Sequence, residues 1–166
     1  MNAPGMPNHD PSRFSYYVTY TDWQRDDRVV DDIAVRERVR LLLEREARLL
    51  DQYRYEEWLT LYLPNFVYWV PATPDGGDPR VQVAVTFDDR RRTEDRIFRF
   101  RTGYAWSQAP PSRTVRLIGN VEVFRTASPT ELMVRSNFIT SEFWDNETRM
   151  LTGWAGHRLM QQDGHW

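Results

Sequence analysis

The sequence predicts an α+β fold in which helices come first and pack on one face of a strongly curved, mostly antiparallel sheet. Two observations lead to this prediction. In the N-terminal and central parts of the chain, apolar residues recur at steps of three and four, which is the period of a helix. The C-terminal third instead alternates apolar and polar residues in three stretches of up to about 14 residues, and strands of that length twist and bend.

The chain has 166 residues, enough for one domain with a sizeable core. We divide it into an N-terminal arm, residues 1–28, and a single domain, residues 29–166. The arm starts with a stretch rich in Pro, Asn and Gly, which we expect to be disordered. Its second half carries five rings, and because exposed rings are a liability in a free tail, we expect the arm to pack on its own domain or on a neighbour. These rings are Phe14, Tyr16, Tyr17, Tyr20 and Trp23.

The first long helix is predicted over residues 31–51. Asp31 and Asp32 lie at its N-terminal end, where free N–H groups and the helix dipole favour carboxylates. The opposite face from its arginines carries an apolar stripe, which predicts packing against the sheet. The stripe consists of Val35, Val39, Leu42, Leu43, Ala47 and Leu50.

Shorter elements are predicted in the middle of the chain. A helix over 55–62 should end at Pro64, and strands are expected over 66–70 and 81–87. The second strand should be half-buried, because apolar residues occupy every other position. These are Val81, Val83, Val85 and Phe87.

Residues 88–101 return to helical spacing, with Ile97 and Phe98 expected inside and Gly103 as the end of the helix. The other face interleaves arginines with acidic residues. Such a run fits a phosphate site or a solvated face, but we favour a network of ion pairs within or between chains.

The last third predicts three strands joined by turns at 127–129 and 145–147. Val115, Leu117, Val121 and Val123 are expected on one face of the first strand, and Leu132, Val134, Phe138 and Trp144 on one face of the second. The third strand is expected over 150–160. A curved antiparallel meander follows from these three strands.

The composition excludes several classes of function. The 22 basic residues nearly balance the 24 acidic ones, so a nucleic-acid partner is not expected. There is no cysteine, which excludes disulfides and a Rieske cluster in this chain. Only His157 lies away from the termini, so neither a metal site nor a cofactor site is expected. With no membrane-length apolar run and no leader pattern, we expect a cytoplasmic chain without a membrane partner.

All 22 basic residues are arginine. Arginine makes planar bidentate contacts and, with Trp and Tyr, dominates the energetics of protein interfaces. Four tryptophans of the domain are accordingly interpreted as core or interface anchors rather than as substrate-stacking residues. They are Trp58, Trp69, Trp106 and Trp144.

Several short motifs lie in register along the chain. They read REARLLD at 45–51, YEEWL at 55–59, YWVP at 68–71, DDR at 88–90, DR at 95–96, PPSRT at 110–114 and NVEV at 120–123. Together they resemble the β, or small, subunit of aromatic-ring-hydroxylating dioxygenases. The resemblance covers residues 35–166 and implies the cone-shaped nuclear-transport-factor-2-like fold. The family continues with another strand where this chain stops, so we expect either a truncated chain or a dispensable last strand.

The resemblance also implies a function. Members of the family assemble with a larger α subunit, commonly as α3β3, and the α subunit holds the Rieske [2Fe–2S] cluster and the mononuclear iron. We therefore expect a structural subunit without catalytic, cofactor-binding or metal-binding residues of its own. Structural or interface roles are expected for Trp58, Tyr68, Asp89, Arg96, Trp106, Arg113 and Asn120.

Two other hypotheses stay open. Free-standing isomerases, dehydratases and cyclases of the same fold place an acid or base inside the cone, and His157 with Asp51 or Tyr53 could serve in this way. We favour the simpler interpretation of a hydrogen-bonded strand histidine and a carboxylate at a helix end. The second hypothesis is a module that only sequesters an aromatic ligand.

Overall fold

The computed structural model describes residues 23–73, 82–102, 110–162, 164 and 166. Within these residues three α-helices precede or interrupt the strands, as the sequence predicts, and a short 3-10 helix that was not predicted comes before them. Trp106, Gly103 and residues 1–22 of the arm lie outside the described part. In chain order the elements are η1 (Asp26–Arg28), α2 (Ile33–Asp51), α3 (Tyr55–Leu59), β1 (Val67–Pro71), β2 (Ala84–Asp89), α4 (Arg90–Arg101), β3 (Arg113–Arg125), β4 (Glu131–Trp144) and β5 (Glu147–Met160).

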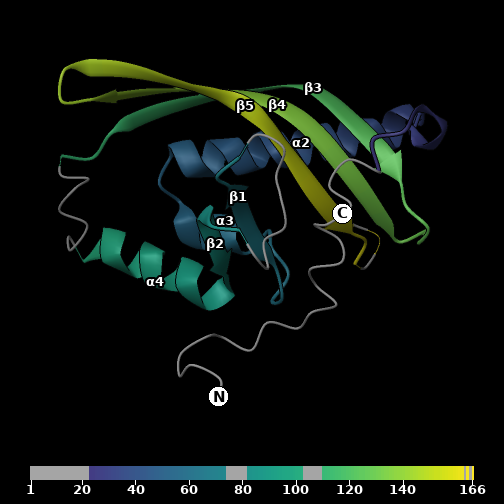
Figure 1. Ribbon diagram of the computed structural model, residues 1–166, viewed down its shortest axis with the longest axis horizontal. Coiled ribbons are helices and arrows are strands. Elements are labelled where there is room, and N and C mark those ends of the chain that lie inside the picture. The colour runs from purple at the N-terminus through teal and green to yellow at the C-terminus, as the bar shows by residue number, and fades with distance from the viewer. Residues whose placement is uncertain (1–22, 74–81, 103–109, 163, 165) are drawn as a thin grey trace.

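The described strands form two antiparallel sheets, β1-β2 and β3-β4-β5. The three-stranded sheet bends over α2, while α3, the β1-β2 hairpin and α4 lie on the same side (Figure 1). This arrangement confirms the predicted α+β class with helices on one face of a strongly curved sheet. No helix of the described part is long and apolar enough to cross a membrane.

Helix α2 begins where the sequence predicts. The Asp32 carboxylate caps it by accepting hydrogen bonds from the backbone N–H groups of Ala34 (2.8 Å) and Val35 (3.1 Å). Its apolar stripe packs against the sheet in a cluster of buried side chains. That cluster comprises Val30, Val39, Leu43, Val123, Leu132 and Val134.

A second buried cluster joins the C-terminal end of α2 to α3 and α4. It consists of Leu49, Trp58, Leu59 and Ile97. At this end Asp51, the last residue of α2, accepts hydrogen bonds from the Thr114 hydroxyl (2.8 Å) and the Arg116 backbone N–H (2.9 Å). The Arg116 guanidinium also pairs with the Asp51 carboxylate. These contacts attach α2 to the start of β3.

Three local predictions are wrong. Helix α3 ends at Leu59 rather than at residue 62. Phe98 is 61 % exposed. Asp89 caps α4, and the helix that starts there turns Thr93 and Ile97 toward the core and Phe98 away from it. Val85, at 70 % exposed, lies on the face of the β1-β2 hairpin opposite to Asp88, which is the one buried residue of β2.

Strand β3 changes faces in its middle, which the sequence prediction missed. Val115 and Leu117 are 70 % and 65 % exposed, whereas Val123 is fully buried. The pairing with β4 shifts between Gly119 and Glu122, so two residues of β3 oppose one of β4. A one-residue insertion moves every following side chain to the other face.

The last two strands are joined as predicted. Asp145 and Asn146 both have positive φ (49° and 61°), and Trp144 pairs with Glu147. Two successive residues of this kind form the type I′ turn that suits the twist of a hairpin. Long, continuous pairing of β4 with β5 follows from it.

Candidate functional site

The sheet β3-β4-β5 has two chemically different faces. We call the face that carries Val134 and its cross-strand partner His157 the inner face, because both lie toward α2. Side chains alternate along a strand, so Ile139 and Thr152 lie on the opposite, outer face. Both faces are candidates for function.

On the inner face, one carboxylate collects three donors. Glu46 of α2 accepts hydrogen bonds from the Trp58 indole N–H (3.3 Å) and from the Tyr62 hydroxyl, and its other oxygen lies 3.3 Å from His157 Nε2. We call these four residues the inner polar cluster. Their side chains come from α2, α3, the turn after α3 and β5, so the cluster links the helices to the last described strand.

The charges of this cluster support one another. Burial opposes the charge of Glu46, but the attraction of His157 and the hydrogen bonds outweigh it and hold the pKa of Glu46 below its usual range. Burial likewise opposes the charge of His157, yet Glu46 raises the pKa of His157 above its ordinary 6.5. Burial and the Glu46 carboxylate raise the pKa of Tyr62 well above its usual value.

The histidine has a different partner from those that the sequence suggested. Asp51 is bound by Thr114 and Arg116, as described above, and Glu46 occupies the position beside His157 instead. The other nitrogen, His157 Nδ1, is buried and has no hydrogen-bond partner among the described residues. The Glu46 carboxylate is therefore occupied by groups of its own chain, which is the arrangement expected of a structural pair.

One part of the outer face is apolar and exposed, whereas the part near Glu131 and Arg135 carries ion pairs. The cross-strand rows of the apolar part combine Val115, Ser141 and Met150, then Leu117, Ile139 and Thr152. Several of these side chains are exposed over more than a third of their surface, which is unusual for neighbouring apolar residues on a finished surface. They are Val115, Leu117, Ile139, Phe143 and Met150.

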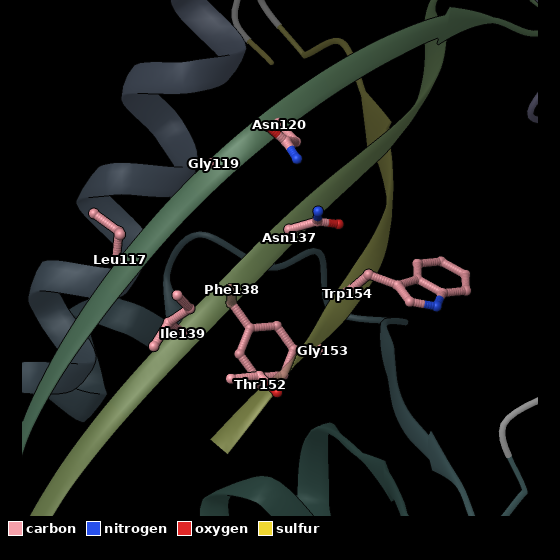
Figure 2. Close-up of a pocket in the computed structure, with 9 residues that line it drawn as sticks. All are labelled: Leu117, Gly119, Asn120, Asn137, Phe138, Ile139, Thr152, Gly153 and Trp154. Carbon is pink, nitrogen blue, oxygen red and sulfur yellow. The ribbon is translucent and has the colours of Figure 1, made fainter. Parts of the chain in front are cut away.

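An open hollow of about 420 Å³ lies across the three strands at this level. Figure 2 shows Leu117, Asn137, Ile139 and Trp154 among the side chains around it. Asn120, the bulge residue, also contributes to its wall and has a positive φ of 48°. The hollow thus combines an apolar floor with two amides, a surface that suits an aromatic ring with a polar tip.

The residues singled out in the sequence are dispersed rather than gathered into one site. Trp58 is buried and belongs to the inner polar cluster, and Tyr68 lies against it with ring centroids 6.5 Å apart. Asp89 caps α4 by accepting from Arg92 N–H (2.9 Å).

Two arginines behave differently. Arg96 pairs with the Asp88 carboxylate, which is almost fully buried. Arg113 is exposed at the start of β3 and has no ion pair within the described residues. Asn120 lies in the bulge of β3. The residues predicted from the sequence therefore come from α3, β1, β2, α4 and β3 rather than from one site.

Sequence reasoning missed Glu46, Tyr62 and Asp88. A signal for Glu46 was present, because this residue follows Leu43 by three positions and so lies within the apolar stripe of α2. A carboxylate within an apolar stripe needs a buried partner. Within the described residues, no group of three or more His, Cys, Asp or Glu could hold a metal ion.

Comparisons with known proteins agree on one family. The sequence pattern of the family described as "Ring hydroxylating beta subunit" matches residues 45–166. The chain is 32 % identical to the benzoate 1,2-dioxygenase subunit beta of Acinetobacter baylyi, over 69 % of this chain and 70 % of that protein. It is 38 % identical to the 2-halobenzoate 1,2-dioxygenase small subunit of Burkholderia cepacia, over 57 % of this chain and only 58 % of that protein.

A solved structure shows the same fold. The β subunit of the benzoate 1,2-dioxygenase of Burkholderia mallei superposes with a TM-score of 0.65 at 26 % identity, over 82 % of this chain and 85 % of that one.

Proposed function

The chain belongs to the ring-hydroxylating β subunit family, and from this premise we propose that it is a non-catalytic, structural subunit of an aromatic-ring-hydroxylating dioxygenase. The chemistry would reside in a larger α subunit that carries a Rieske [2Fe–2S] cluster and a mononuclear iron. We propose an α3β3 assembly in a bacterial cytoplasm. The observation that carries the proposal is the continuous family match over residues 45–166.

The inner polar cluster supports a structural role for this chain. A catalytic base needs a proton acceptor that is available to a substrate. The carboxylate of Glu46 instead receives three groups of its own chain, and His157 Nε2 faces that carboxylate. The hollow of the sheet lies at Leu117 and Ile139, on the other face from His157.

Co-expression with the α subunit of a ring-hydroxylating dioxygenase, sought first in the neighbouring gene, tests the proposal. We expect the two proteins to co-purify, the isolated chain to contain no iron and show no visible absorbance, and oxygenase activity or α-subunit solubility to rise when both are present. Full oxygenase activity of the α subunit alone, with no association on size exclusion, would overturn the proposal.

The variant His157→Ala separates this function from a stand-alone isomerase or dehydratase. In a structural subunit, the loss of His157 lowers the yield or stability of the complex but leaves activity per assembled complex unchanged. A turnover by the isolated chain that disappears in His157→Ala would favour the enzyme instead. Arg99→Ala, a change in the last turn of α4, serves as a matched control outside the cluster.

A further inference from the structure

The outer face already receives one side chain from the N-terminal arm. Trp23, the first described residue, is 9 % exposed and lies edge-on to Phe124 with ring centroids 5.4 Å apart. A methyl group on Gly156 would lie only 3.3 Å from the Trp23 ring. Glycine at this position of β5 therefore leaves the space that the tryptophan fills on the outer face.

The chain crosses the outer face on its way to Trp23. Val29 forms a bridge with Phe124 of β3, and Val30 N–H donates to the Val123 carbonyl (2.8 Å). Six residues earlier, Trp23 has reached Gly156 on β5, at the far edge of the sheet β3-β4-β5. Residues 1–22 thus start from a point on the outer face itself.

The arm has the residue pattern of a segment that covers an apolar surface. Between residues 14 and 20, every even position is aromatic or apolar, whereas the odd positions hold Ser15, Tyr17 and Thr19. Apart from Tyr17 this stretch alternates, and alternation places one set of side chains on one side of an extended chain. The set is Phe14, Tyr16, Val18 and Tyr20. Trp23 lies in a turn, so the alternation ends before it.

The reach of the arm matches the distance to the hollow. Along β5, Trp154 and Thr152 lie two and four residues from Gly156, or about 7 and 13 Å. Tyr20 precedes Trp23 by three residues, about 10 Å of extended chain, and Phe14 by nine, about 30 Å. Tyr20 therefore reaches the hollow.

From these observations we infer that residues 14–20 of the same chain dock on the outer face, with the Tyr20 ring in the hollow between Trp154 and Leu117. The apolar floor receives the ring, and the amides of Asn120 and Asn137 can bond its hydroxyl. The inference does not depend on the proposed function, since it concerns the chain without an α subunit.

Thiol labelling tests the inference, because the chain has no native cysteine. Leu117→Cys is labelled in the full chain and in a chain that lacks residues 1–20. Docking of the arm in about nine molecules of ten slows labelling of the full chain about tenfold. Leu151→Cys, one residue from Thr152 but on the inner face, is the matched control and should label at the same rate in both chains.

Equal labelling of Leu117→Cys in both chains overturns the inference. If the shortened chain does not fold, the double variant Tyr16→Ser/Tyr20→Ser in the full chain is compared with the unmodified arm instead. Tyr17→Ser, at an odd position of the arm, is then the control. A second copy of the chain is the competing occupant. Tyr20→Cys/Thr152→Cys distinguishes the two: a disulfide within one chain supports the inference, and a disulfide-linked dimer overturns it.

Discussion

The two faces of the sheet β3-β4-β5 differ in whether this chain completes them. On the inner face the Glu46 carboxylate accepts hydrogen bonds from Trp58 and Tyr62 and pairs with His157. The apolar residues around Val134 are buried by α2. On the outer face, Val115, Leu117 and Met150 remain more than half exposed. The inner face therefore specifies the fold, whereas the outer face is a surface built to be covered.

The largest effect is expected when the inner face loses its carboxylate. Glu46→Ala removes the acceptor of three donors and leaves His157 buried without its counter-charge. We expect a loss of about 3–5 kcal/mol in the free energy of unfolding, measured by urea denaturation. Glu37→Ala, on the exposed side of the same helix, should leave the urea midpoint unchanged. Equal midpoints for Glu46→Ala and the unmodified chain would show that the cluster does not hold the two layers together.

The next largest effect is expected at the bulge that separates the two phases of β3. Asn120 has φ 48°, a conformation that Asn tolerates and a β-branched residue does not. Asn120→Val should destabilise the chain by about 1–2 kcal/mol, while Asn120→Gly should be close to neutral. A thermal or urea melt of both variants decides, with Leu117→Val on the same strand as the control. Similar losses for Val and Gly would indicate that the Asn120 side chain matters rather than its backbone.

The inner polar cluster should also make stability depend on pH. The pKa of His157 is raised in the folded chain. Its contribution to stability is therefore complete below pH 6.5 and is lost as the pH rises through the pKa of the folded state. The pKa of Glu46 is lowered in the folded chain. Its contribution to stability is therefore present above pH 4.5 and is lost as the pH falls through the pKa of the folded state. The ion pair between Glu46 and His157 therefore stabilises the folded chain most between pH 4.5 and pH 6.5.

Urea melts from pH 5 to 9 measure this dependence. We expect the unfolding free energy to fall above neutral pH, by less than the loss in Glu46→Ala because the hydrogen bonds of Trp58 and Tyr62 remain. His157→Gln should flatten the curve in that range. An unchanged slope in His157→Gln would assign the pH dependence to other groups.

The smallest effect is expected on the outer face. Met150 is 66 % exposed, so Met150→Gln should change the unfolding free energy of the isolated chain by less than about 0.5 kcal/mol. Association is the quantity that should respond. Analytical ultracentrifugation compares this variant with Arg149→Gln, its neighbour with the side chain on the other face. A large loss of stability in Met150→Gln would show that Met150 stabilises the folded chain itself rather than its association.

Much of this molecule was predictable because it depends on local chemistry. The alternation of residues in β4, the Asp32 cap of α2 and the Asp145-Asn146 turn each follow from a few neighbouring residues, and the structure contains all three. The family motifs added the order of the elements. The prediction that Phe98 is buried failed, because its burial depends on which side of α4 faces the core, and the Asp89 cap sets that orientation.

The candidate sites were less predictable, because they depend on which distant residues meet. The sequence by itself determined that the chain has no cysteine ligands, that helices precede a long-stranded sheet, and that Glu46 interrupts an apolar stripe. Only the tertiary structure decided that His157 meets Glu46 rather than Asp51, five residues away on the same helix. It also decided that the bulge at Asn120 sends Val115 and Leu117 outward. Periodicity describes one element at a time, whereas partners and faces are set by how α2 packs across three strands.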